Sequence, residues 1–209
     1  MIEQLIGWDR SFTVWINSFH TPFWDDFFFR YTHMWVWAPF YIAYLYFIYK
    51  NNGKKNFWWV LAIGLTILLT DQISSGILKP LTERWRPSRD PELQGIIHTV
   101  NGYVGGKYGF TSSHAANTFG VATLLMLYFR DKWQYFLLIL WALLTGYSRI
   151  YLGVHFFGDV LCGTLIGIIC GSLVFRLFKK KLAPVSDTGL MDKVTYAIFL
   201  LSIMIFSII

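Results

Sequence analysis

Charged residues are scarce in this chain. Asp, Glu, Lys and Arg make up 14% of its 209 residues, against about 25% in soluble domains. Hydrophobic residues account for 55% of the sequence and aromatic residues for 20%. This balance excludes a disordered chain, a coiled coil and an ordinary soluble globule. It indicates that lipid is the main solvent of the chain.

Cysteine is scarce as well. Cys162 and Cys170 share one apolar run, so we expect buried thiols and no disulfide framework. The first residues include Glu3 and no basic segment, and we therefore expect no secretory signal peptide. The net charge of +6 favours an anionic substrate and the bilayer surface over nucleic acid, because the basic residues are confined to a few non-apolar stretches.

Long apolar segments dominate the remainder. Six of them cover residues 34–49, 57–78, 113–129, 133–148, 155–177 and 194–209. Because open strands cannot satisfy their backbone in lipid, we expect helices. The predicted fold is all-α, a polytopic membrane bundle of about six transmembrane helices. Its predicted parts are interfacial amphipathic helices over 1–33, a core over 34–177 with an outer loop over 79–112, and a basic hinge with a final transmembrane helix over 178–209.

Basic residues in the loops predict the orientation. Short, almost purely basic loops at 50–56, 130–132 and 178–193 are expected inside the cell, because positive charge is retained on the cytoplasmic side. Alternation of the spans then places the loop 79–112 on the outer face. In the first 33 residues, Thr21-Pro22 is typical of an N-cap followed by the first position of a second helix.

Polar residues gather at the predicted outer ends of the spans. Three segments carry them: KPLTERWRP from Lys79, TSSH from Thr111 and SRIYLGVHFFGD from Ser148. Polar groups near lipid are costly unless they are paired, so such clusters indicate a function. Fixed cations and a helix N-terminus with hydroxyl groups both suit phosphate oxygens. The predicted phosphate-binding residues are Lys79, Arg86, Ser112, Ser113 and Arg149.

Two histidines flank these phosphate-binding residues. His155 and Asp159 lie four residues apart on a predicted helix and therefore share one face. The carboxylate can hold one imidazole nitrogen while the other acts as a nucleophile. His114 follows the two serines, where a protonated imidazole can donate to a leaving oxygen. The predicted catalytic residues are thus His155, Asp159 and His114, with a phosphohistidine intermediate.

Several other residues receive structural interpretations. Basic side chains at span ends are typical interfacial anchors, and Arg30, Arg84 and Arg89 are interpreted in this way. His20, His33 and His98 are interpreted as interfacial residues. Asp71 lies within a span and needs a polar partner, for which we expect Asn117. The ridge of Gly163, Gly167 and Gly171 predicts close packing of a neighbouring helix.

These motifs resemble those of the type 2 phosphatidate phosphatase family, which shares its core with glucose-6-phosphatase and the vanadium haloperoxidases. The family motifs are K-x6-R-P, P-S-G-H and S-R-x5-H-x3-D. The first and third match in full, from Lys79 to Pro87 and from Ser148 to Asp159. The second departs, with Thr111 for Pro and Ser113 for Gly, and the added side chain narrows the site. The resemblance covers about residues 57–177 and implies the catalytic and phosphate-binding roles assigned above.

The resemblance also implies an activity. We expect metal-independent hydrolysis of a phosphomonoester or pyrophosphate of a membrane lipid, without a cofactor, at the outer face of a bacterial cytoplasmic membrane. Too few carboxylates lie in the outer clusters for a magnesium or two-metal site. Among such lipids, we expect undecaprenyl pyrophosphate as the substrate. The alternatives are lipid A phosphatase, phosphatidylglycerol phosphate phosphatase, a lipid-to-lipid phosphotransferase and, outside enzymes, an anion or lipid transporter.

Overall fold

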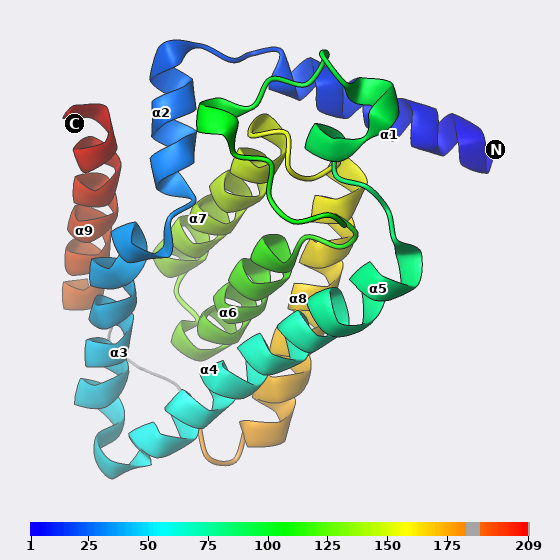
Figure 1. Cartoon of the computed structure of the whole chain (residues 1–209). Helices are drawn as coiled ribbons and strands as arrows, with labels where there is room; N and C mark the ends of the chain where they lie inside the picture. The colour runs from blue at the N-terminus through cyan, green and yellow to red at the C-terminus, as the bar shows by residue number, and fades with distance from the viewer. Residues whose placement is uncertain (183–188, 209) are drawn as a thin grey trace.

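The computed structural model describes residues 1–182 and 189–208, and this part of the chain is all-α, without a named strand. Its α-helices are α1 (Ile2–Asn17), α2 (Pro22–Tyr31), α3 (Ala38–Asn52), α4 (Asn56–Asp71), α5 (Lys79–Thr82), α6 (Ser113–Phe129), α7 (Lys132–Tyr151), α8 (Phe157–Phe178) and α9 (Gly189–Ile208). The predicted helical bundle is confirmed (Figure 1). Residues 183–188 of the predicted basic hinge lie outside the described residues.

Helix α6 occupies the centre of the bundle, with α4, α7 and α8 packed around it (Figure 1). The predicted glycine ridge explains how close α8 comes. A Cβ atom on Gly163, Gly167 or Gly171 would lie 2.4–2.5 Å from a backbone carbonyl oxygen of α6 or of its N-cap residue. Such distances are far inside van der Waals contact, so the two backbones meet because these positions lack side chains.

Two helical stretches, Asn56–Thr82 and Phe157–Phe178, are long and apolar enough to cross a membrane by length and composition. The first joins α4 and α5 through a π-helical segment, η3 (Gln72–Leu78). Helices α3, α6, α7 and α9 contain 15 to 20 residues each. These helices correspond to the other four apolar segments of the sequence. The total of about six membrane spans stays a prediction.

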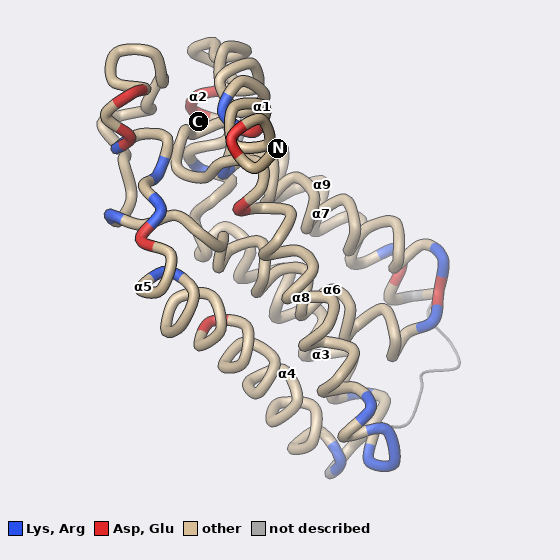
Figure 2. Tube along the Cα trace, turned by 90° about the vertical axis from the view of Figure 1, so that its right-hand side faces the viewer, with Lys and Arg blue, Asp and Glu red and all other residues tan. Residues whose placement is uncertain are grey.

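Charged residues gather at the two ends of the bundle, while the middle of the helices is almost free of them (Figure 2). One end carries the loops 50–56 and 130–132 and the residues that directly follow α8. There the Asn52 amide donates to the Tyr128 hydroxyl, and Lys181 lies 5.0 Å from the ring centroid of Trp58. The N-terminal helices and the loop 79–112 lie at the other end (Figure 1), as expected for the described residues, and the side of the membrane stays a prediction.

The N-terminal region forms two helices, and the second begins at Pro22, as the sequence predicts. The Thr21 hydroxyl accepts a hydrogen bond from the Trp24 N–H at 3.3 Å, as an N-cap does. Helix α1 lies across the end of the bundle that carries the loop 79–112, against α7 and α8 (Figure 1). Helix α2 contacts α7 and α9, and Phe28 packs on Tyr147 and Tyr151. Helix α2 is therefore part of the packed bundle.

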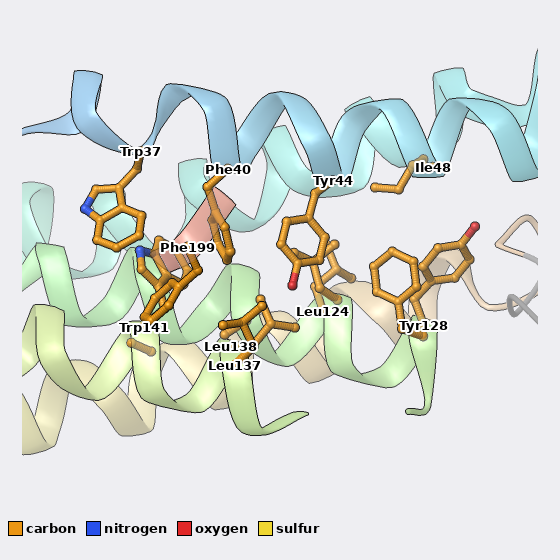
Figure 3. Close-up of a cluster of buried hydrophobic side chains, with 14 of the residues drawn as sticks. Trp37, Phe40, Tyr44, Ile48, Leu124, Tyr128, Leu137, Leu138, Trp141 and Phe199 are labelled. Carbon is orange, nitrogen blue, oxygen red and sulfur yellow. The ribbon is translucent and has the colours of Figure 1, made fainter. Parts of the chain in front are cut away.

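An aromatic cluster joins α3, α7 and α9 (Figure 3). The Phe40 ring lies 5.6 Å from that of Trp141, and the Trp37 ring lies 5.6 Å from that of Phe199. Buried aromatic pairs at such distances contribute about 0.5–1.5 kcal/mol beyond their burial. The cluster fixes one apolar wall beside the candidate site, because Trp37, Phe40 and Trp141 also line the cavity described below.

Candidate active site

Lys79 reaches the N-terminus of α6 from the first position of α5. Its Nζ donates to the hydroxyls of Ser75 and Ser113, both at 3.0 Å. Ser112 is the buried N-cap residue, and its backbone N–H donates to the Asp159 carbonyl at 3.0 Å. The structure thus brings the first and second motifs together at a helix N-terminus, where the backbone favours anions.

Arg86 and His155 form the buried centre of the site. Arg86 Nη1 lies 3.1 Å from His155 Nε2 and donates to the Val154 carbonyl at 3.0 Å. A guanidinium group has no acceptor, so this approach requires a lone pair on Nε2 and assigns the ring proton to Nδ1. Burial and the neighbouring cations, Arg86 first and then Arg149, hold the pKa of His155 well below its usual range. The imidazole is therefore neutral near pH 7.

Asp159 faces the protonated nitrogen of His155. Its Oδ2 lies 3.5 Å from His155 Nδ1 and accepts the Phe156 N–H at 3.0 Å. The ring–carboxylate distance exceeds that of a good hydrogen bond, and it can shorten when the ring becomes charged. A Cβ atom on Gly109 would lie 2.9 Å from Oδ2, so glycine at this position leaves room for the carboxylate.

Arg84 corrects the sequence analysis, which interpreted it as an interfacial anchor. Its guanidinium donates to Asp159 Oδ1 at 2.8 Å and to Asp9 Oδ2 at 2.6 Å. It also lies 4.3 Å from the centroid of the Phe156 ring. Asp9 comes from α1, 75 residues earlier, and this separation hides the partnership from sequence reasoning. Arg84 therefore belongs to the site, as the group that holds the second oxygen of Asp159.

Arg149 is fully buried beside these residues. One Nη donates to the Thr32 hydroxyl and the other to the Tyr103 hydroxyl, the latter at 2.8 Å. No described residue accepts a hydrogen bond from its Nε, which leaves a buried donor free for an anion. His114 follows Ser113 in the first turn of α6 and lines the adjoining cavity together with it. The eight predicted site residues therefore converge on one region.

Asp71 and Asn117 do not pair, and the prediction that they would is wrong. The Asp71 carboxylate accepts the Ser75 hydroxyl at 3.1 Å, and Asn117 Oδ1 accepts the Thr70 hydroxyl at 2.5 Å. Side chains three or four residues apart on a helix lie on one face, so Ser75 satisfies Asp71 locally, while Asn117 pairs with Thr70, the residue before Asp71 on α4. Because Ser75 also accepts from Lys79, Asp71 supports the position of that lysine.

A cavity of about 540 Å³ adjoins the site. Its wall is mostly apolar and comes from α2, η1 (Met34–Trp37), α3, α4, α6 and α7. Ser113 and His114 lie on its polar side, together with Asp71. The His114 side chain is accessible to solvent and lines this cavity. An anionic group held by the basic residues would therefore have apolar space beside it.

Several known proteins are similar to this chain in sequence and in fold. A lipid A 4′-phosphatase of Bacteroides thetaiotaomicron is 40% identical over 92% of this chain and 87% of that protein. A lipid A 4′-phosphatase of Porphyromonas gingivalis is 36% identical over 85% of this chain and 75% of that protein. The crystal structure of Aquifex aeolicus LpxE covers 79% of this chain and 93% of its own, with a TM-score of 0.61 and 29% identity.

Fold, site and relatives together define a helical membrane lipid phosphatase. The chain belongs to the PAP2 superfamily, whose family model matches residues 57–183. The resemblance seen in the sequence motifs is confirmed, and the matched segment agrees closely with the predicted 57–177. Membership of this phosphatase family rules out the alternative of an anion or lipid transporter.

Replacing Arg84 with Gln is expected to lower kcat by about tenfold to hundredfold. The buried Asp159 would lose its charged partner, and leaving a buried charge uncompensated is costly. KM should change little, because Arg84 is not among the proposed phosphate ligands. Phosphate release at saturating and limiting substrate separates the two constants. The control is Arg89→Gln, which removes an exposed arginine bonded only to the Gly105 carbonyl among the described residues. Equal effects of the two substitutions would contradict the role of Arg84.

Proposed function

We propose that this chain is a lipid A phosphatase that works through a phosphohistidine on His155. The observation that carries the proposal is the shared border between the basic site and the apolar cavity, at Ser113 and His114. A lipid phosphate needs both features, because its head is anionic and its chains are apolar. Both relatives described above are named lipid A 4′-phosphatases, which supports lipid A over the undecaprenyl pyrophosphate favoured by sequence reasoning.

Phosphate binding follows from the free donors of the site. Lys79 Nζ, the guanidinium groups of Arg86 and Arg149, and the backbone N–H group of Ser113 would surround the three non-bridging oxygens, while Ser112 caps the helix with its own N–H held by the Asp159 carbonyl. These groups are held in place before substrate arrives, which reduces reorganisation in the transition state. The charge of a five-coordinate phosphorus would be spread over the same donors.

Attack begins at His155 Nε2, the nitrogen that carries the lone pair. The N–P bond forms on one side of the phosphorus while the bond to the lipid oxygen breaks on the other. The bound phosphate anion would favour the protonated form of His114, which gives its proton to that oxygen, and the lipid alcohol leaves. The phosphorylated imidazole is cationic, and Asp159 compensates this charge through the proton on Nδ1.

Water completes the cycle. The neutral His114 takes a proton from a water molecule, whose oxygen attacks the phosphorus of the phosphohistidine. The N–P bond breaks, inorganic phosphate is released, and His155 returns to its neutral form while His114 is protonated again. No metal is needed for these steps, because the site's own cations and N–H groups supply the electrostatic stabilisation.

The proposed setting is the cytoplasmic membrane, with the site on the outer face. Support comes from the basic loops at the opposite end of the bundle, because positive charge is retained in the cytoplasm. In the proposed division of the chain, residues 34–177 form the phosphatase core, residues 1–33 cover its outer end, and the last helix completes the bundle. Single cysteines placed in the loops 50–56 and 79–112, labelled in intact cells, test this orientation.

A substrate panel tests the proposed specificity. We expect kcat/KM for a lipid A 4′-phosphate to exceed that for undecaprenyl pyrophosphate and phosphatidylglycerol phosphate by at least about tenfold. Purified protein in detergent is supplied with each lipid, and both free phosphate and phosphorylated lipid products are measured. A preference for undecaprenyl pyrophosphate would contradict the proposal. Phosphate found on a second lipid instead of in solution would identify a phosphotransferase.

A further inference from the structure

Three metal-ligating side chains meet at the outer end of the bundle. His20 comes from the α1–α2 connection, Asp25 from the first turn of α2 and His98 from the loop 79–112. One ligand atom of each lies within 4.8 Å of the others. Within residues 1–182 and 189–208, this is the one group of three or more His, Cys, Asp or Glu side chains with such geometry. None of the three belongs to the proposed catalytic machinery.

We propose that His20, Asp25 and His98 bind a divalent transition-metal ion of the Zn²⁺ class. Two imidazoles and one carboxylate suit such an ion, because its preferred protein ligands are nitrogen, sulfur and carboxylate oxygen. Water would complete the coordination sphere. The acidic clusters preferred by Ca²⁺ and Mg²⁺ need several oxygen ligands, whereas this group offers one carboxylate. The chemistry of the three side chains therefore selects the class of ion.

Small movements of these side chains would convert the present geometry into a bound state. His98 Nε2 lies 2.7 Å from Asp25 Oδ2, and the rings of His20 and His98 are stacked with centroids 4.0 Å apart. Metal–ligand bonds of about 2.1 Å place tetrahedral ligand atoms about 3.4 Å apart. The exposed His20 ring must turn out of the stack to aim a nitrogen at the ion. Because it is exposed, this rotation costs little packing.

Neighbouring groups already orient two of the ligands. The Tyr151 hydroxyl donates to Asp25 Oδ1 at 2.7 Å and leaves Oδ2 for the ion. The Asn17 side chain accepts from the His98 N–H at 2.8 Å and donates to the His98 carbonyl at 3.0 Å. Second partners of this kind fix ligand orientation and contribute to metal affinity.

A bound ion would cross-link the segment around the start of α2, which carries His20 and Asp25, to the outer loop, which carries His98. The outer loop already packs tightly on the turn after α7, since a Cβ atom on Gly153 would lie 2.5 Å from Ile97 and 3.1 Å from the His98 carbonyl oxygen. His155 follows two residues later. The ion would thus hold the outer loop against the segment that carries the nucleophile. Its role would be structural, and it would take no part in bond breaking.

Direct metal binding tests the proposal. Protein without a histidine tag is purified in detergent, treated with chelator and titrated with Co²⁺, whose visible absorption reports coordination, and then with Zn²⁺ in competition. One equivalent per chain is expected. His20→Ala and His98→Ala should each weaken binding more than tenfold, and Tyr151→Phe by about tenfold. Melting temperatures measured without metal show that each variant is folded.

His33→Ala is the matched control. His33 is exposed like His20, lies near the same end of the chain and contacts the ring of Phe29, but is outside the cluster. This variant should bind one equivalent with unchanged affinity. Wild-type protein that takes up no Co²⁺ or Zn²⁺ would overturn the proposal, as would variants of His20 and His98 that bind like the wild type.

Discussion

Replacing His155 with Ala is expected to reduce phosphate release by about four orders of magnitude or more, as removal of a nucleophile does in other enzymes. The variant should also lose any acid-labile phosphoenzyme. The His155 imidazole presents the lone pair of its Nε2 beside Arg86. The alanine variant lacks this proposed nucleophile and therefore cannot form the N–P bond.

The measurement needs a folded variant. Quenched reactions with labelled lipid phosphate give both turnover and trapped phosphoenzyme, and the melting temperature reports the fold. His33→Ala serves as the control, because it removes an exposed imidazole outside the site. A fully active His155→Ala protein, or a phosphoenzyme that persists in it, would remove the proposed mechanism.

Replacing Gly167 with Val is expected to destabilise the folded bundle by about 3 kcal/mol or more, in the manner of overpacked cores. Even a single Cβ atom at this position would lie 2.5 Å from the Ala116 carbonyl oxygen and 2.8 Å from the Gly120 nitrogen. Both neighbours are backbone atoms, so neither can move aside as a flexible side chain would. Helix α8 would have to separate from α6 along much of its length.

The yield of folded protein and its melting temperature measure this effect. Gly64→Val is the matched control, because Gly64 also lies in a helix, is exposed, and has no described atom within 4 Å of an added Cβ. It should retain nearly the stability of the wild type. If both variants melted alike, close contact between α6 and α8 would not be what holds the bundle together.

Local patterns in the sequence predict most of the fold. The apolar runs correspond to helices because lipid forces every backbone group into local hydrogen bonds. The break at Pro22 and the glycine ridge of α8 are readable for the same reason, since each depends on neighbours along one helix. The motif spacing also brings together the eight predicted site residues, although their roles stay predictions.

Long-range partners are the part that the sequence hides. An arginine near a span end looks the same whether it reaches the headgroups or a carboxylate, and only the fold brings Asp9 to Arg84. Asp71 shows the opposite error, because a distant partner was expected where Ser75, one turn away, suffices. His98 was interpreted as an interfacial residue, and the structure places it beside Asp25, 73 residues earlier.

Helix α1 gives the site a dependence that the motifs do not reveal. All the motif residues lie within the family-matched segment 57–183, but Asp9 and Thr32, which bind Arg84 and Arg149, lie before it. A protein trimmed to the matched segment would keep every catalytic side chain and still lose part of its electrostatic balance. The boundaries of the functional unit are thus set by charge partners, and they extend at least to Asp9 in α1.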